Sequence, residues 1–172
     1  AAAVQYAQGP LLVVAGDLWS REQVVINEGD LASAVRASMA LPGVFEPVQR
    51  DGRTLVDGGT VNPVPFDLLT DDCETVIAVD VAGERTPPAN GEVGYFETVF
   101  NAAKVMQQAI VSAKREVSEP ELYLAPEIRD IRSLEFYRAE EVFEQASSAQ
   151  ERLRHELSQL IRSVPDTSPE AP

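Results

Sequence analysis

Asp57 is the residue of this sequence whose position points most directly to chemistry. It follows the run Thr54-Leu55-Val56 and precedes Gly58 and Gly59. Three β-compatible residues before two glycines predict a buried strand that ends in a tight turn, because glycine tolerates the positive φ that such a turn needs. Asp57 then lies at the C-terminal end of a strand, the edge at which open α/β sheets collect ligands and catalytic groups. The alternative is a turn aspartate whose carboxylate only binds the backbone two residues further on.

The composition is that of a soluble globular protein with a sizeable core. Of the 172 residues, 44% are hydrophobic and 24% are charged, a length and balance that suit one domain. No apolar run reaches the roughly 18 residues that a membrane-spanning helix needs, and the first residues lack the basic and apolar regions of a signal peptide. We therefore expect residues 1–164 to form part of a single α/β domain and residues 165–172 to be a disordered tail.

The charge and the rare residue types exclude several classes of function. A net charge of −14 repels phosphates, so we expect no nucleic-acid partner. Cys73 is the only cysteine, which excludes an internal disulfide and a Cys/His zinc site. We expect it to be a small packing residue in a reducing cytoplasm. The only histidine, His155, lies among charged residues, so we expect it to be solvated and not a catalytic base. We expect no cofactor.

Strands and helices alternate along the chain. We expect strands at 11–15, 24–26, 48–49, 54–56, 75–81 and 122–124, and helices at 31–39, 95–117 and from 133 to near 164. Asp30 is the expected cap of the first helix, and 75–81 is the clearest buried strand. This alternation predicts an α/β fold with a largely parallel sheet. One apolar stripe with helical spacing is expected to be core: Phe96, Val99, Phe100, Ala103, Met106, Ile110, Ala113 and Val117.

Three segments, in their order and spacing, resemble the second half of the bacterial patatin-like phospholipases. They are residues 37–47, Val56-Asp57-Gly58-Gly59 and Asn62-Pro63-Val64-Pro65, and the resemblance extends over about residues 11–149. It implies a three-layer α/β fold and hydrolysis of lipid acyl esters by a Ser-Asp dyad without histidine. The family's acid belongs to an Asp-Gly-Gly or Asp-Gly-Ala motif. It maps onto Asp57, with Gly58 and Gly59 supporting the motif.

A Ser-Asp dyad makes a physical demand on its aspartate. A serine hydroxyl is a poor nucleophile unless a base within hydrogen-bond distance takes its proton. A carboxylate with an ordinary pKa of about 4 is a weak base. Burial at the strand end must therefore raise the pKa of Asp57 if it serves this role.

The sequence departs from the family in lacking a nucleophile. It contains no Gly-x-Ser-x-Gly and no glycine-rich oxyanion loop, both of which lie upstream of the matched segments in the family. Ser38 lacks the flanks of a nucleophile elbow, so we expect it to pack within its helix. We therefore expect a C-terminal part of a patatin-like hydrolase that is inactive alone. Its expected partners are a lipid or acyl-ester substrate and the missing N-terminal segment that carries the nucleophile, and a homo-oligomer is a further expectation because a truncated sheet exposes an edge.

Two alternatives stay open at this point. The first is a non-catalytic module, derived from the same fold, that binds lipid or a partner protein. The second is a carboxylate cluster for Mg²⁺ or Ca²⁺ formed by Asp17, Asp57 and Asp80, all of which are predicted at strand ends.

Overall fold

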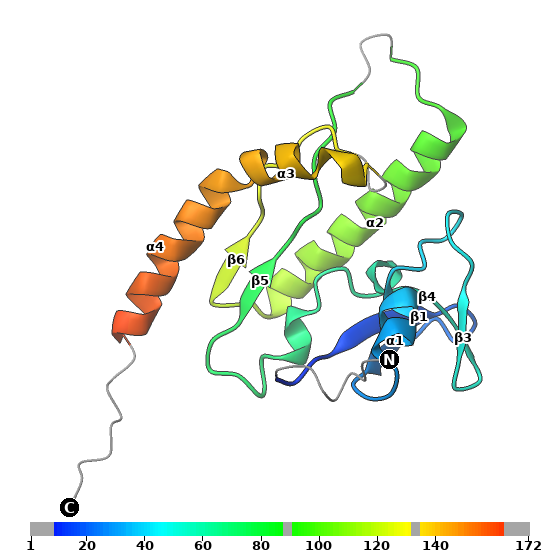
Figure 1. Cartoon of the computed structure of the whole chain (residues 1–172), viewed down its shortest axis with the longest axis horizontal. Helices are drawn as coiled ribbons and strands as arrows, with labels where there is room; N and C mark the ends of the chain where they lie inside the picture. The colour runs from blue at the N-terminus through cyan, green and yellow to red at the C-terminus, as the bar shows by residue number, and fades with distance from the viewer. Residues whose placement is uncertain (1–8, 88–90, 132–134, 164–172) are drawn as a thin grey trace, which may run out of the picture. The chain divides into compact units, whose positions relative to one another are not determined.

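The computed structural model describes residues 9–87, 91–131 and 135–163 (Figure 1). The predicted tail at 165–172 lies outside the described residues. So do residues 133 and 134, which begin the last predicted helical region.

The chain folds as two compact units. One comprises Ala1–Glu74 and Val93–Glu119, and the other comprises Thr75–Glu92 and Pro120–Pro172. Both contain helical segments and strands, so the predicted mixed α/β class is confirmed.

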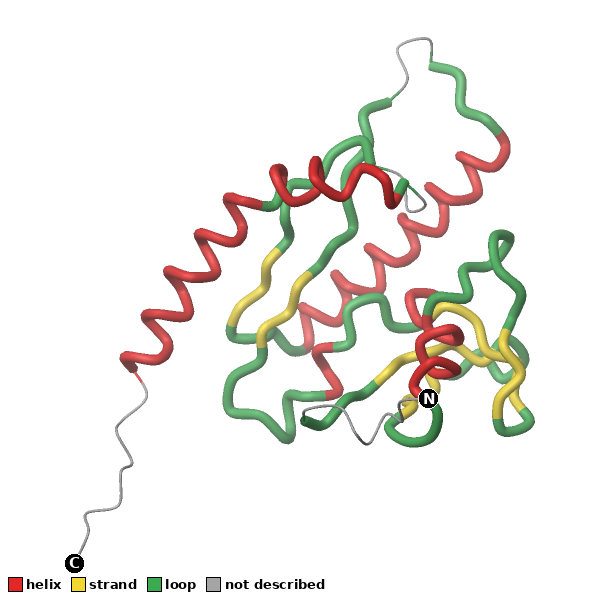
Figure 2. Tube along the Cα trace, viewed as in Figure 1, coloured by secondary structure: helices red, strands yellow, loops and turns green. Residues whose placement is uncertain are grey.

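The first unit contains a four-stranded sheet (Figure 2). Its strands are β1 (Val13–Asp17), β2 (Gln23–Ile26), β3 (Val48–Arg50) and β4 (Arg53–Asp57). The spatial order is β2-β1-β4-β3, so β4, which ends at Asp57, is one of the two central strands. Within the β1–β4 pair, Ala15 lies opposite Asp57. The strand predictions for this region are therefore confirmed, with small shifts of the bounds.

The predicted largely parallel sheet is not confirmed, because all three pairings in this sheet are antiparallel. Short connections account for two of these pairings, β3 with β4 and β1 with β2. Asp51 and Gly52 join β3 to β4 with φ values of 50° and 76°, the positive pair typical of a tight hairpin turn. A short turn, closed by a hydrogen bond from Arg21 N to Asp17 O, joins β1 to β2. Parallel neighbours need a crossover of about a dozen residues or more.

Helix α1 (Leu31–Ser38) begins at its predicted cap. The carboxylate of Asp30 accepts a hydrogen bond from Ser33 N at 2.7 Å, which satisfies one of the free amides of the first turn. Two fully buried alanines of the helix, Ala34 and Ala37, pack in the same core as Leu55 of β4. Because their side chains are small, the helix lies close to the sheet. This core fixes the strand that carries Asp57.

Two short 3₁₀ turns follow β4, and one long helix completes the unit. The turns are η2 (Gly58–Thr60) and η3 (Phe66–Leu68), and the helix is α2 (Tyr95–Val117). The predicted helix bounds of 95–117 are confirmed, because the apolar period of the sequence specifies a helix irrespective of its neighbours.

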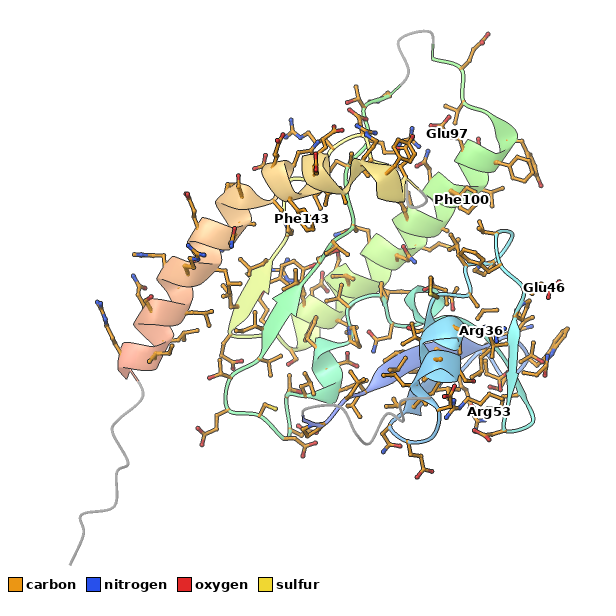
Figure 3. All side chains as sticks on the ribbon, in the orientation of Figure 1. Arg36, Glu46, Arg53, Glu97, Phe100 and Phe143 are labelled. Atoms are coloured by element: carbon orange, nitrogen blue, oxygen red, sulfur yellow. The ribbon has the colours of Figure 1, made fainter. Side chains whose placement is uncertain are left out.

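The predicted core stripe of α2 is wrong for several residues, since Phe96 is 71%, Met106 61% and Val117 89% exposed. The covered face of the helix includes Gln107 and Lys114. It also includes Glu97 and Phe100, which lie near its N-terminal end (Figure 3). Polar contacts made by Lys114, described below, hold this face toward the rest of the first unit.

The second unit is built on a parallel pair of strands. These are β5 (Ile77–Val79) and β6 (Leu122–Leu124), with Ile77 opposite Leu122. They are followed by η4 (Phe136–Arg138), α3 (Ala139–Gln145) and α4 (Ser147–Ser163). The prediction of a fully buried strand is wrong for Ile77 and Val79, which are 38% and 48% exposed, because only one face of the segment is covered, the face of Val76, Ala78 and Asp80.

None of the helices in the described ranges has the length and apolar character needed to cross a membrane.

Candidate active site

Asp57 lies at the C-terminal end of β4, as predicted. Its backbone N donates to Ala40 O at 3.0 Å, which ties the strand end to the segment that follows α1. Its backbone O accepts from Thr60 Oγ1 at 2.7 Å. Hydrogen bonds thus hold the main chain of Asp57 at both its N and its O. They fix the position of the Cα from which the side chain extends.

The carboxylate of Asp57 is held by one hydrogen bond. Oδ1 accepts from Gly59 N at 2.7 Å, the turn contact that the alternative interpretation expects. Among the residues that the structure describes, no hydrogen bond reaches Oδ2. One bond therefore orients the carboxylate, and its second oxygen keeps its lone pairs for another donor.

Burial raises the pKa of Asp57. The side chain is partly withdrawn from water, which penalises the charged form, and the hydrogen bond from Gly59 N only partly opposes this. The direction of this shift is the one that a carboxylate acting as a base requires.

The two glycines after Asp57 are required by close approach. A Cβ on Gly58 would lie 2.3 Å from the backbone O of Val14, and a Cβ on Gly59 would lie 2.6 Å from Nε2 of Gln107 and 3.0 Å from Oδ1 of Asp57. Neither glycine has a positive φ. The predicted positive φ is therefore wrong, and close neighbours are what require residues without a side chain at these two positions.

A polar cluster around the buried Asn62 holds the segment that follows the glycines. Asn62 is 4% exposed and donates from Nδ2 to Gln23 Oε1 at 2.6 Å and to Asp67 Oδ1 at 3.1 Å. Lys114 of α2 donates to Asn62 Oδ1, to Val64 O at 2.6 Å and to Asp67. We call Gln23, Asn62, Asp67 and Lys114 the Lys114 cluster. It fixes the segment 62–65 to α2.

Two further features complete the Lys114 cluster. The ammonium of Lys114 lies 4.5 Å from the centroid of the Phe66 ring, a cation–π contact. Partial burial works toward a higher pKa for Asp67, but hydrogen bonds from Lys114 and Asn62 and the charge of Lys114 outweigh it, so the pKa of Asp67 is lowered. Sequence reasoning missed Lys114. The available signal was a lysine, one of only two in the chain, that lies four residues after Ile110 and three before Val117, within the apolar stripe of the predicted helix.

Two of the three aspartates predicted to form a cation site accept hydrogen bonds from their own neighbours instead. Asp17 accepts from Trp19 N at 3.0 Å within the turn after β1. In the second unit, Asp80 accepts from Ala82 N at 2.9 Å and from Tyr123 Oη at 2.6 Å. Across the described ranges, no group of three or more His, Cys, Asp or Glu side chains is arranged to hold a metal ion.

Three other singled-out residues have clear positions. Cys73 is exposed, so its predicted role as a packing residue is wrong. His155 is exposed on α4, with its Nε2 2.8 Å from Gln159 Nε2. Ser38 is the half-buried last residue of α1.

Comparison with known proteins supports the resemblance seen in the sequence. Residues 3–70, which include Asp57, Gly58 and Gly59, match the patatin-like phospholipase family. An uncharacterized NTE family protein of Mycobacterium tuberculosis is 38% identical over 88 residues, covering 51% of this chain and 24% of the relative. Lysophospholipase NTE1 of Eremothecium gossypii is 30% identical over 160 residues, covering 78% of this chain and 10% of the relative. The same-named protein of Saccharomyces cerevisiae is 30% identical over 132 residues, covering 63% and 8%. The chain thus spans a quarter or less of the length of these relatives.

Proposed function

We propose that this chain, whose similarity is to the patatin-like phospholipases, supplies the acid of a Ser-Asp dyad in a lipid acyl-ester hydrolase. Asp57 is the dyad residue, and Gly58 and Gly59 shape the turn that presents it. The observation that carries the proposal is the half-buried carboxylate at the end of β4, with its pKa raised by burial and one oxygen held by Gly59 N.

The proposed chemistry uses Asp57 as a base and then as an acid. Its carboxylate takes the proton of the serine hydroxyl while the serine oxygen bonds to the ester carbonyl carbon. The protonated Asp57 then returns that proton to the leaving alcohol as the ester bond breaks. Water, deprotonated in turn by Asp57, hydrolyses the acyl-serine, and the proton goes back to the serine. The raised pKa of Asp57 favours the two steps in which it takes a proton, from the serine and from the water.

We propose that the serine and the oxyanion donors come from a segment outside these 172 residues. The sequence contains no Gly-x-Ser-x-Gly, and the matched part of this chain covers a quarter or less of these relatives. The family's three-layer fold would form with that segment present. The chain alone should hydrolyse nothing at a measurable rate, because nucleophile and oxyanion donors contribute most of the acceleration.

The test is fluorophosphonate labelling of the full natural polypeptide that contains this chain, read by intact mass, with hydrolysis of a lysophospholipid as the activity assay. We choose that substrate class because two relatives are named lysophospholipases. The expected result is one label per polypeptide, lost in Asp57→Asn and kept in Asp71→Asn, an exposed carboxylate control. Labelling of the full polypeptide that Asp57→Asn leaves unchanged would exclude Asp57 as the dyad acid.

A second candidate is the non-catalytic module. The absence of a nucleophile motif from this sequence favours it. A full polypeptide that takes no label, yet binds lysophospholipid, would establish this function in place of the hydrolase.

A further inference from the structure

We propose that Gln107 of α2 is a substrate-contacting residue, whose side-chain amide donates a hydrogen bond to an oxygen of the acyl ester bound beside Asp57. This inference rests on the proposed hydrolase function and extends it to a residue outside the region that matches the family, which ends at residue 70.

The first observation is the position of the Gln107 amide. Its Nε2 lies 2.6 Å, and Oδ1 of Asp57 lies 3.0 Å, from the point that a Cβ on Gly59 would occupy. The amide and the carboxylate therefore border the same small space. No carbon atom fits at that point, so the lack of a side chain at residue 59 is what lets the amide come close to the carboxylate.

The second observation is that the Gln107 amide has a donor to spare. Gln107 is half-buried, and no hydrogen bond joins its side chain to another of the described residues. An amide nitrogen carries two N–H donors. Oδ1 of Asp57, which borders the same point, already accepts from Gly59 N at 2.7 Å. Gln107 thus faces the site with an unused donor, while Lys114 on the same face of the helix is fully engaged with Asn62, Val64 and Asp67.

The proposed chemistry limits how far the bound ester can lie from the Asp57 carboxylate. A base must lie about 3 Å from the serine oxygen, and that oxygen must approach the ester carbonyl to about 3 Å. The ester therefore binds within about 6 Å of the Asp57 carboxylate. The two distances to the Cβ point of Gly59 place the Gln107 amide within about 6 Å of Oδ1 of Asp57, so an ester bound on that side of the carboxylate can accept its hydrogen bond.

The chain offers a matched control for this inference. Gln108 is the next residue of the same helix, has the same side chain and is exposed. Gln107→Ala removes the donor, Gln107→Met removes it while keeping the length of the side chain, and Gln108→Ala should leave the site untouched.

The experiment measures kcat and KM for lysophospholipid hydrolysis, together with the melting temperature, in the full natural polypeptide. We expect Gln107→Ala and Gln107→Met to raise KM by about fivefold, the loss of one neutral hydrogen bond. We expect kcat within twofold of the wild type and melting temperatures unchanged. Gln108→Ala should match the wild type in every parameter.

The possible outcomes separate this inference from the function that it rests on. A wild-type polypeptide that takes no fluorophosphonate label overturns both. An active wild type with KM unchanged in Gln107→Met overturns the role of Gln107 alone. A fall in melting temperature without a change in KM, in both Gln107 variants, identifies a packing residue and also overturns the inference.

Discussion

Two carboxylates of the first unit, Asp57 and Asp67, are both partly buried and have opposite electrostatic environments. Asp67 has a cation, since Lys114 bonds to it directly, and its pKa is lowered. Asp57 has only the amide of Gly59, and its pKa is raised. The unit thus places its half-buried lysine where it stabilises the backbone segment, and no cation of the described residues pairs with the other carboxylate. A carboxylate that is partly buried and has no cation is available as a base.

The largest expected effect is on the turn that follows Asp57. Gly58→Ala places a Cβ 2.3 Å from the backbone O of Val14, in the neighbouring central strand. Backbone cannot move aside as a side chain can, so we expect a loss of about 3 kcal/mol in the free energy of unfolding. Urea denaturation measures it, with Gly94→Ala as the control because a Cβ there meets nothing within 4 Å. A loss no greater than that of the control would show that β1 and the turn are not in close contact.

The next effect tests the Lys114 cluster. Lys114→Met leaves buried Asn62 Oδ1 and Val64 O without their donor, so we expect a loss of about 2 kcal/mol in the free energy of unfolding. A double-mutant cycle with Asp67→Asn measures how much of this loss is the ion pair. Purely additive losses would mean that the pair contributes nothing and that the comparison with Asp57 must rest on hydrogen bonds alone.

A smaller effect is expected at the second glycine. Gly59→Ala meets the end of the Gln107 side chain, which can move, so we expect a loss of about 1 kcal/mol in the free energy of unfolding. If the ester binds beside Asp57 and Gln107, the displacement of both side chains in the same variant should reduce hydrolysis by a larger factor than it reduces stability. Equal losses in the free energy of unfolding for Gly58→Ala and Gly59→Ala would contradict this expectation, because the first Cβ meets backbone and the second meets the end of a side chain.

The most delicate test is the pH dependence of stability. Because the pKa of Asp57 in the folded protein is raised above its ordinary value of 3.8, the protonated carboxyl stabilises the fold. This contribution to the free energy of unfolding is fully present below pH 3.8 and is lost as pH rises through the raised pKa. Asp57→Asn has no carboxyl to ionise at this position. The melting temperature of the variant, relative to that of the wild type, should therefore increase as pH rises above 3.8. The pKa shift of Asp67 has the opposite sign. Asp67→Asn should therefore lower the melting temperature at neutral pH, and this difference from the wild type should shrink as pH falls below 3.8. If the difference in melting temperature between variant and wild type changed with pH in the same direction for both variants, the two carboxylates would not have opposite electrostatic environments.

Local features of the fold and site could be predicted from the sequence. The position of Asp57, the cap at Asp30 and the bounds of α2 all depend on residues close to one another in the chain. Turn chemistry, capping and hydrophobic period act over such short distances, so a single sequence is enough to specify them.

Features that depend on distant contacts could not be predicted. The apolar period of α2 specifies a helix, but its covered face is set partly by the hydrogen bonds from Lys114 to residues of the segment 62–67. The requirement for Gly58 comes from Val14 on another strand, which no local pattern indicates. Likewise, strand alternation with helices predicted parallel pairing, whereas the order β2-β1-β4-β3 is antiparallel throughout.

The different neighbours of the two glycines constrain how this sequence can vary among natural homologues. Position 58 faces backbone, so no substitution elsewhere makes room for a side chain, and we expect glycine there in every homologue that keeps this turn. Position 59 faces the tip of Gln107, so its identity is coupled to that of position 107. Homologues with alanine at position 59, the other form of the family motif, should carry a shorter side chain at 107. Positions 59 and 107 should therefore covary, although they lie far apart in the chain.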